Sequence, residues 1–200
     1  MKKIWVDILN EGEIKTSVVR QLKYFYKDKR YNVEVNFPQD RPAQHNRNKS
    51  IKEFLKSDFD YYVVCDYDIV PLMNPLDLVE ANKDIIGCLC LTIKENTLLW
   101  VAFDYKDNKY QPLDIKQMKK DGFKGFMEVD VVGSGCMIIK REVLEKVKAP
   151  FERQWDDDGL AIKGLDFYFC EKAKKDGFKV WIHSDFIGSH YKTVDLLNYI

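Results

Sequence analysis

The sequence lacks several features that would point to particular classes of protein. Basic and acidic residues are equal in number, 32 of each, so no general positive field is available to hold a nucleic-acid duplex. No apolar run reaches the roughly 20 residues that a membrane-spanning helix needs. There is no CxxC pair, and Cys88 and Cys90 have no histidine nearby, which argues against a zinc site. No tract rich in proline, glycine or serine divides the chain.

The composition is typical of one compact domain over residues 1–200. Of the 200 residues, 46% are hydrophobic and 32% are charged, so the chain can bury a core. The five cysteines fall in apolar runs or in an expected helix, as buried thiols do in a reduced, cytoplasmic protein. Residues 2–9 are expected to form a strand rather than a signal peptide, because no cleavage-site pattern follows them.

Hydrophobic periodicity predicts an α/β fold. Strand and helix patterns alternate through the first half of the chain, which favours a parallel sheet, whereas the second half is mixed. Residues 98–105 and 109–113 are expected to form an antiparallel pair that turns at Asp107-Asn108. We therefore expect a three-layer α/β/α nucleotide-binding, Rossmann-like sandwich with a mostly parallel central sheet and an antiparallel edge. The other expected strands are 2–9, 31–37, 60–66, 84–93, 126–132, 136–140, 178–184 and 186–191, and the expected helices are 13–29, 49–57, 74–82, 141–147 and 165–177.

Asp66-Tyr67-Asp68 is the most informative motif. It lies at the carboxyl end of an expected buried strand, where ligands gather in open α/β sheets. Residues two apart on an extended backbone point the same way, so both carboxylates can face one site. Paired carboxylates opposite phosphate oxygens are a usual way of holding Mg²⁺ or Mn²⁺. The alternative is a solvated strand end, since D-x-D is common by chance; the apolar strand before it and the capped helix expected at Asn74-Pro75 favour the metal site.

Longer segments resemble a known family. The stretch RPAQHNRNKSIKEFLKSDFDYYVVCDYDIVPLMNPLDLV (41–79), continued by DIIGCLC (84–90), is similar to the GT-A glycosyltransferases, and in particular to compact family-2-like members found in phages and prokaryotes. EVDVVGSGCMIIKREVLEKV (128–147) resembles their acceptor-side segment, and GLDFYFCEKAKKDGFKVWIHSDFIGSH (164–190) resembles their closing segment. The order and spacing of these segments carry the resemblance, rather than any one motif.

The resemblance implies a metal-dependent glycosyltransferase. Such an enzyme moves a sugar from a nucleotide-diphosphate-sugar donor, above all a UDP-sugar, to an acceptor hydroxyl, and we expect inversion. Residues 1–93 would be the nucleotide-sugar-binding half of a single domain and residues 94–200 the acceptor-side half. Asp66, Tyr67 and Asp68 would hold the donor diphosphate together with Mn²⁺ or Mg²⁺. The acceptor, whether a glycan, a modified nucleic acid or a protein, is not indicated.

Two later residues take further roles in the resembled family. Asp166 occupies the position of the carboxylate that activates the acceptor; many members have Glu-Asp where this chain has Leu165-Asp166, and we expect the second position to be the base. Its alternative role is to stabilise the N-terminus of its own helix. His190 would be the third metal ligand. Its alternative is a packed residue at a strand end, and His183 competes for the ligand role.

Other residues are expected around the donor. The loops after the first two strands of the resembled fold cradle the nucleotide base and ribose, which makes Asp7, Asp40 and Arg41 candidates. Arg47 is expected in the first turn of a helix, where it would contact the diphosphate or belong to a solvated basic face.

Two glycine-containing segments also bear on the site. Gly133 and Gly135 would allow a close backbone approach to a ligand, or they form a β-bulge or tight turn. They lack the longer dinucleotide fingerprint, so a dehydrogenase is rejected. Residues 155–160 (WDDDGL) would form either a lid in which Trp155 stacks on the donor or a surface loop.

Two other functions remain open from the sequence. A sugar-phosphate nucleotidyltransferase should have a glycine-rich loop near its N-terminus, and ILNEGEIKTS (8–17) has one glycine. A non-catalytic nucleotide-sugar-binding protein of the same fold is favoured by Leu165 in the glutamate position.

Overall fold

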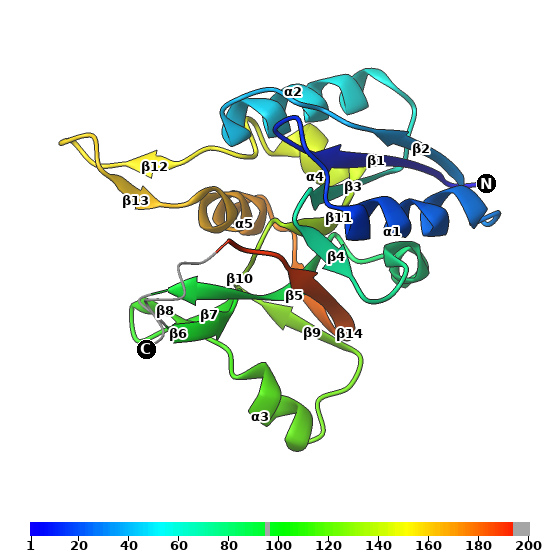
Figure 1. Cartoon of the computed structure of the whole chain (residues 1–200). Helices are drawn as coiled ribbons and strands as arrows, with labels where there is room; N and C mark the ends of the chain where they lie inside the picture. The colour runs from blue at the N-terminus through cyan, green and yellow to red at the C-terminus, as the bar shows by residue number, and fades with distance from the viewer. Residues whose placement is uncertain (95–96, 194–200) are drawn as a thin grey trace.

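The computed structural model describes residues 1–94 and 97–193, and in this part of the chain the main sheet is nine-stranded (Figure 1). Its path runs in the order β2–β1–β3–β11–β5–β14–β4, with β6 added to β5 and β9 to β14. The strands are β1 (Lys3–Leu9), β2 (Asn32–Asn36), β3 (Tyr61–Asp66), β4 (Ile69–Pro71), β5 (Ile85–Lys94), β6 (Thr97–Trp100), β9 (Phe126–Val129), β11 (Cys136–Lys140) and β14 (Val180–His190).

The sheet is mixed, with both parallel and antiparallel strand pairs, and the predicted α/β fold class is confirmed. β1 runs parallel to β2 and β3, and β5 runs parallel to β14, whereas β4 and β9 are antiparallel to β14 at one edge. One strand differs from the expectation, because β11 is antiparallel to both of its neighbours, β3 and β5, and lies inside the sheet. β9, β10 (Val131–Val132) and β11 follow one another without a crossover helix.

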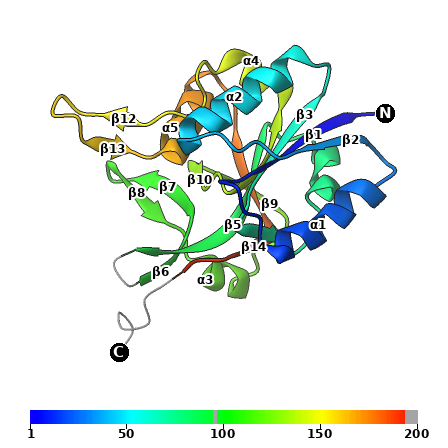
Figure 2. The same cartoon turned by 45° about the horizontal axis from the view of Figure 1, so that its top comes forward.

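Helices cover both faces of the sheet (Figures 1 and 2). On one face lie α1 (Thr16–Lys27) and the 3₁₀ helix η1 (Pro75–Ala81), and on the other lie α2 (Ala43–Lys56), α4 (Arg141–Lys146) and α5 (Leu165–Lys175). Successive residues of β3 alternate between the two cores: Val63 and Cys65 pack with α1, and Tyr62 and Val64 pack with α2. Burial on both faces explains why this strand is a continuous apolar run.

α2 begins earlier than the sequence predicts. The sequence predicts a helix over residues 49–57, but the helix starts at Ala43. Asn46, Arg47 and Ser50 are buried polar residues of its first turns, so apolar periodicity does not mark them. Arg47 therefore lies in the second turn with its side chain in the interior, and the expectation of a first-turn position is wrong.

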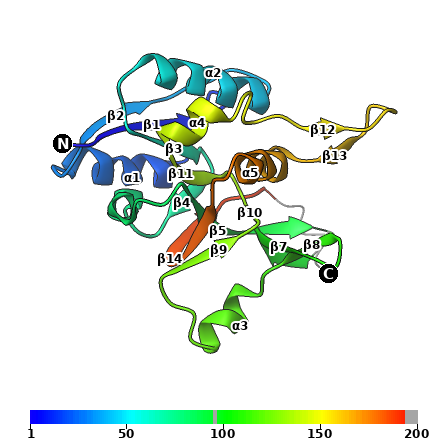
Figure 3. The same ribbon diagram turned by 180° about the vertical axis from the view of Figure 1, so that it is seen from behind.

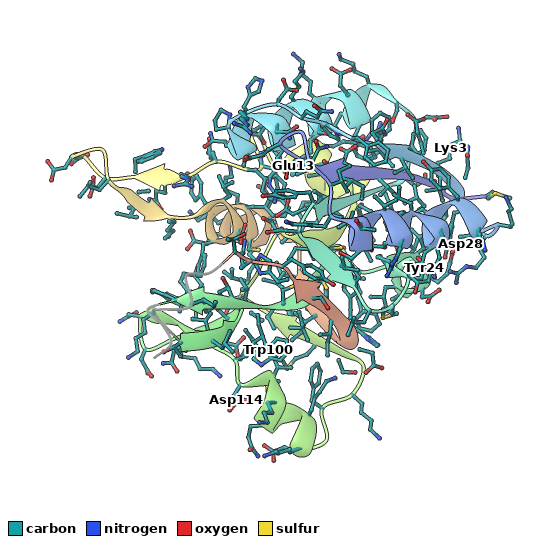
Figure 4. All side chains as sticks on the ribbon, viewed as in Figure 1. Lys3, Glu13, Tyr24, Asp28, Trp100 and Asp114 are labelled. Atoms are coloured by element: carbon teal, nitrogen blue, oxygen red, sulfur yellow. The ribbon has the colours of Figure 1, made fainter. Side chains whose placement is uncertain are left out.

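A smaller sheet of β10, β7 (Ala102–Lys106) and β8 (Lys109–Pro112) lies beside the main one. The predicted turn at Asp107-Asn108 is confirmed, since both residues have positive φ angles, 52° and 60°, as a tight hairpin requires. α3 (Ile115–Lys120) follows, and its N-cap residue is Asp114, which is labelled in Figure 4. Asp114 Oδ1 accepts a hydrogen bond from the backbone of Gln117 at 2.9 Å and so caps the helix.

Residues 155–160 form the end of a hairpin, β12 (Gln154–Trp155) and β13 (Ala161–Lys163), that projects from the body beyond α5 (Figure 3). Trp155 is 55% exposed there. All five cysteines are described and are buried with free thiols. None of the helices in residues 1–94 and 97–193 is both long enough and apolar enough to cross a membrane.

Candidate active site

The ends of β3 and β14 meet at one place on the molecule. β3 ends at Asp66, and a turn through Tyr67 and Asp68 leads into β4. β4 pairs with the last residues of β14, so that His190 lies opposite Ile69. This register brings His190 next to Asp68, although the two are far apart in the sequence.

Asp66 is paired with the buried side chain of Arg47. Arg47 Nη2 lies 2.6 Å from Asp66 Oδ1, and Arg47 Nη1 donates to the carbonyl oxygen of Ser134 at 3.1 Å. Burial raises the pKa of Asp66 to about 6 against the opposing charge of Arg47. The nearby carboxylates of Asp68 and Asp166 also raise it. A cation beside this carboxylate therefore favours its ionised form at neutral pH.

Asp68 contacts two basic side chains. Lys192 Nζ lies 3.0 Å from Asp68 Oδ2, and His190 Nε2 lies 3.4 Å from the same oxygen. Burial opposes ionisation, but the contacts with His190 and Lys192 outweigh it and hold the pKa of Asp68 below its ordinary value. Asp68 is thus a carboxylate at neutral pH.

The ring of His190 is oriented by the backbone. His190 Nδ1 lies 2.8 Å from the carbonyl oxygen of Leu91. A carbonyl oxygen can only accept, so Nδ1 carries the hydrogen. In the neutral ring, Nε2 then turns its lone pair towards the carboxylate of Asp68. The imidazole nitrogen and the carboxylate oxygen can both donate an electron pair, so together they suit a cation.

The expected metal ligands Asp66, Asp68 and His190 have the right chemistry but are not gathered around one point. In residues 1–94 and 97–193, no group of three or more histidine, cysteine, aspartate or glutamate side chains is placed to hold a metal ion. Arg47 and Lys192 neutralise the two carboxylates separately instead. Carboxylate oxygens and an imidazole nitrogen are nevertheless donors that Mn²⁺ accepts, so these residues fit a divalent cation.

Two cavities meet at Asp66. One, of about 200 Å³, is lined by residues that follow β1 and β2 and by the turn 66–68. The other, of about 470 Å³, extends from Asp66 across the turn 133–135 to the start of α5. Arg47, Asp66 and Lys192 line both cavities. A ligand that crosses Asp66 can therefore occupy both.

Asp166 lines the larger cavity at the start of α5. The hydroxyl of Ser134 donates to Asp166 Oδ1, which ties the helix to the turn 133–135. Both glycines of this turn line the cavity and are needed for close packing. A Cβ atom on Gly133 would lie 2.8 Å from the nearest side-chain atom, and one on Gly135 would lie 2.9 Å from its nearest neighbour. The turn therefore has glycine because the surrounding protein leaves no room for a side chain.

Three of the residues expected to bind the nucleotide-sugar donor lie near the smaller cavity. Asp40 and Tyr67 line it, and Asp40 is paired with Lys49 at 2.8 Å. Arg41 is exposed and pairs with Glu11, a lining residue, at 3.3 Å. These side chains belong to one loop cluster, but Arg41 does not itself line the cavity.

Asp7 lies beneath the site rather than in its lining. It is fully buried on β1, where Trp5 Nε1 donates to its carboxylate at 2.8 Å and the hydroxyl of Ser50 donates to its other oxygen. Burial raises the pKa of Asp7. In this structure its contacts join β1 to α2 and leave no surface for a ligand.

Lys192, Ser134 and Arg153 line the larger cavity without having been assigned a role from the sequence. Lys192 follows His190 by two residues, so alternation along an extended chain could have placed both beside Asp68. Ser134 is marked only by the glycines around it. Arg153 lies in a loop with no pattern that indicates a site.

No protein-family model and no curated protein matches this sequence. Solved structures do match. One is the crystal structure of A197 from STIV, with a TM-score of 0.60 and 22% identity over 96% of this chain and 87% of that chain. Another is the crystal structure of GalNAc-T7 with UDP, GalNAc and Mn²⁺, with a TM-score of 0.55 and 14% identity over 97% of this chain and 44% of that chain. This chain therefore spans less than half of the GalNAc-T7 chain. These similarities show a GT-A-like, glycosyltransferase-type fold.

Proposed function

We propose that this protein is a metal-dependent glycosyltransferase that moves a sugar from a nucleotide-diphosphate-sugar donor to an acceptor hydroxyl with inversion. The observation that carries the proposal is that Asp66 lines both cavities where they join, while Asp68 lines one of them and His190 the other. A protein of similar fold has been crystallised with UDP, GalNAc and Mn²⁺, which supports a UDP-sugar as the donor.

The smaller cavity is assigned to the nucleoside and the junction at Asp66 to the diphosphate. Arg47 and Lys192 line this junction and supply positive charge to the phosphate oxygens. Asp66, Asp68 and His190 would hold Mn²⁺ or Mg²⁺, and the bound ion would offset the negative charge that develops on the departing nucleoside diphosphate.

The larger cavity is assigned to the transferred sugar and the acceptor hydroxyl. Asp166 borders it from α5, so a hydroxyl bound there can give its proton to this carboxylate. Ser134 orients Asp166 by donating to Oδ1, and we assign the proton to Oδ2. An acceptor activated from this side attacks the sugar opposite the diphosphate, which is why we propose inversion.

The test is to measure nucleotide binding and nucleotide release separately. With Mn²⁺ present, UDP or a UDP-sugar should raise the melting temperature, because a ligand that binds only the folded state stabilises it. A panel of nucleotide sugars should show release of the nucleoside diphosphate. Asp166→Asn should reduce this release by about 100-fold or more without weakening UDP binding. Asp176→Asn, at the other end of the same helix, is the matched control and should leave both unchanged.

Three outcomes would contradict the proposal. If no nucleotide raises the melting temperature with Mn²⁺ and no donor is consumed, the site does not hold a nucleotide sugar. Binding without turnover, with Asp166→Asn indistinguishable from wild type, would indicate a non-catalytic binding protein. Release of pyrophosphate from a nucleoside triphosphate and a sugar phosphate would indicate nucleotidyl transfer.

A further inference from the structure

Four buried cysteines lie together on the α1 side of the sheet, and two of them, Cys88 and Cys90, also line the larger cavity of the candidate active site. They come from the neighbouring strands β3, β11 and β5, whereas Cys170 lies in the core on the other face. The proposed transfer reaction uses none of their thiols. The four cysteines of this core are Cys65, Cys88, Cys90 and Cys136.

Cys65 and Cys136 lie opposite each other on the antiparallel strands β3 and β11. Hydrogen-bonded and non-hydrogen-bonded pairs alternate along such strands. The backbone N–H of Asp66 donates to the carbonyl oxygen of Gly135 at 2.7 Å, so these two residues form a hydrogen-bonded pair. Cys65 and Cys136 are therefore the next, non-hydrogen-bonded pair, in which the Cα atoms are about 4.5 Å apart. That separation is within the range of about 4.4–6.8 Å that a disulfide spans.

The sulfur atoms agree with this geometry. Cys65 Sγ and Cys136 Sγ are 3.1 Å apart, whereas Cys88 Sγ and Cys90 Sγ are 3.8 Å apart. Cys88 and Cys90 are two residues apart on one extended strand, so their Cα atoms are separated by about 6.6 Å, near the upper limit for a disulfide. Cys65 and Cys136 are thus better placed for a disulfide than Cys88 and Cys90.

We propose that Cys65 and Cys136 are a modification site at which a disulfide forms when the chain folds in the presence of a small-molecule disulfide such as oxidised glutathione. The thiolate of one cysteine attacks the glutathione disulfide and releases one glutathione thiolate. The thiolate of the other cysteine then attacks the mixed disulfide and releases a second. Two protein thiols are oxidised to one S–S bond, oxidised glutathione is reduced, and the two protons pass to the released glutathione.

Burial determines when this exchange takes place. Both cysteines are fully buried in the folded chain, and burial raises the pKa of the Cys136 thiol well above its ordinary value. Thiolate is therefore scarce in the folded state, so the exchange belongs to folding, as β3 and β11 pair and before the core around them closes. Once formed, the bond is shielded from reductants. It would join the strands directly before Asp66 and directly after Gly135, and so fix the two segments that border the candidate active site.

The test is refolding of the whole chain from urea and reductant into a glutathione buffer with either the oxidised or the reduced form in excess. In the oxidised buffer, two of the five thiols should become unavailable to a thiol reagent under denaturing conditions. A peptide map without reductant should contain Cys65 linked to Cys136. The melting temperature should exceed that of the reduced protein by about 10 °C, since the bond closes a long loop of the unfolded chain. Dithiothreitol should reverse the shift only after unfolding.

The remaining cysteines provide controls. Cys65→Ala and Cys136→Ala should each abolish the rise in melting temperature, whereas Cys170→Ala, in the other core, should keep it. The peptide map of the wild-type chain decides the matter even if a variant does not fold. Five free thiols after oxidative refolding, or a bond that involves Cys88 or Cys90, would overturn the proposal.

Discussion

The variant Lys192→Met tests whether the ammonium group beside Asp68 contributes mainly to ligand binding or to the stability of the fold. Lys192 Nζ lies 3.0 Å from Asp68 Oδ2, but 47% of the lysine side chain is exposed. Ion pairs with such an exposed member contribute about 0.2–1 kcal/mol to stability. For a chain of this length, Lys192→Met should therefore lower the melting temperature by about 4 °C at most.

The ligand should respond more strongly than the fold. Lys192 lines both cavities that meet at Asp66, so its ammonium group can donate a charge-assisted hydrogen bond to a diphosphate. A hydrogen bond to a charged group contributes about 1.5–3 kcal/mol, which corresponds to a factor of about 10–150 in a dissociation constant. Isothermal titration of UDP in the presence of Mn²⁺ should show a Kd raised by that factor in Lys192→Met.

Lys179→Met is the matched control. Lys179 Nζ also pairs with a carboxylate, Glu128 at 2.8 Å, but it borders neither cavity. UDP affinity in this variant should equal that of wild type. The reasoning would be refuted by equal UDP affinity in Lys192→Met and wild type, or by a large fall in melting temperature without any loss of UDP binding.

Two further predictions concern the core beneath the site. Asp7→Asn should be more stable than wild type at pH 8, with the difference vanishing towards pH 4. Burial raises the pKa of Asp7 in the folded state, so the protonated carboxyl stabilises the fold below the unfolded pKa of about 3.9, and this stabilisation is lost as the pH rises through the folded pKa. Urea unfolding of both proteins at several pH values measures the difference, and parallel curves of unfolding free energy against pH would contradict the prediction. Gly87→Ala should cost about 1–3 kcal/mol, because its Cβ would lie 2.2 Å from Val132 Cγ1. Adding Val132→Ala should cost less than the sum of the single variants in thermal unfolding, and simple additivity would refute the contact.

The fold class could be predicted because each element of the first half is encoded locally. β3 is a run of apolar residues, and the buried positions of α1, among them Val18 and Phe25, recur at helical spacing. The position of β11 could not be predicted in this way. Its apolar residues indicate a buried strand, but not which strands it lies between or in which direction it runs. The first turns of α2 were missed because their buried side chains are polar.

The candidate site could be predicted only in part, for a related reason. Asp66, Asp68 and His190 are marked by their positions at strand ends and by the resemblance of the surrounding segments. Their partners depend on the register of the sheet, and only Lys192, two residues after His190, could have been found from alternation along an extended chain. The pairs concerned are Arg47 with Asp66, Lys192 with Asp68 and Ser134 with Asp166, which are 19, 124 and 32 residues apart. The metal and donor roles of these residues stay predictions until ligand binding is measured.

β11 also sets the order in which the sheet can be completed. It fills the place between β3 and β5, yet its residues come long after both neighbours in the chain. Until they arrive, two apolar strands face each other across an open slot with unpaired backbone groups, the kind of edge from which aggregation starts. A nascent chain halted before residue 136 would therefore present that slot to its neighbours, and a short peptide with the sequence of β11 should compete for it.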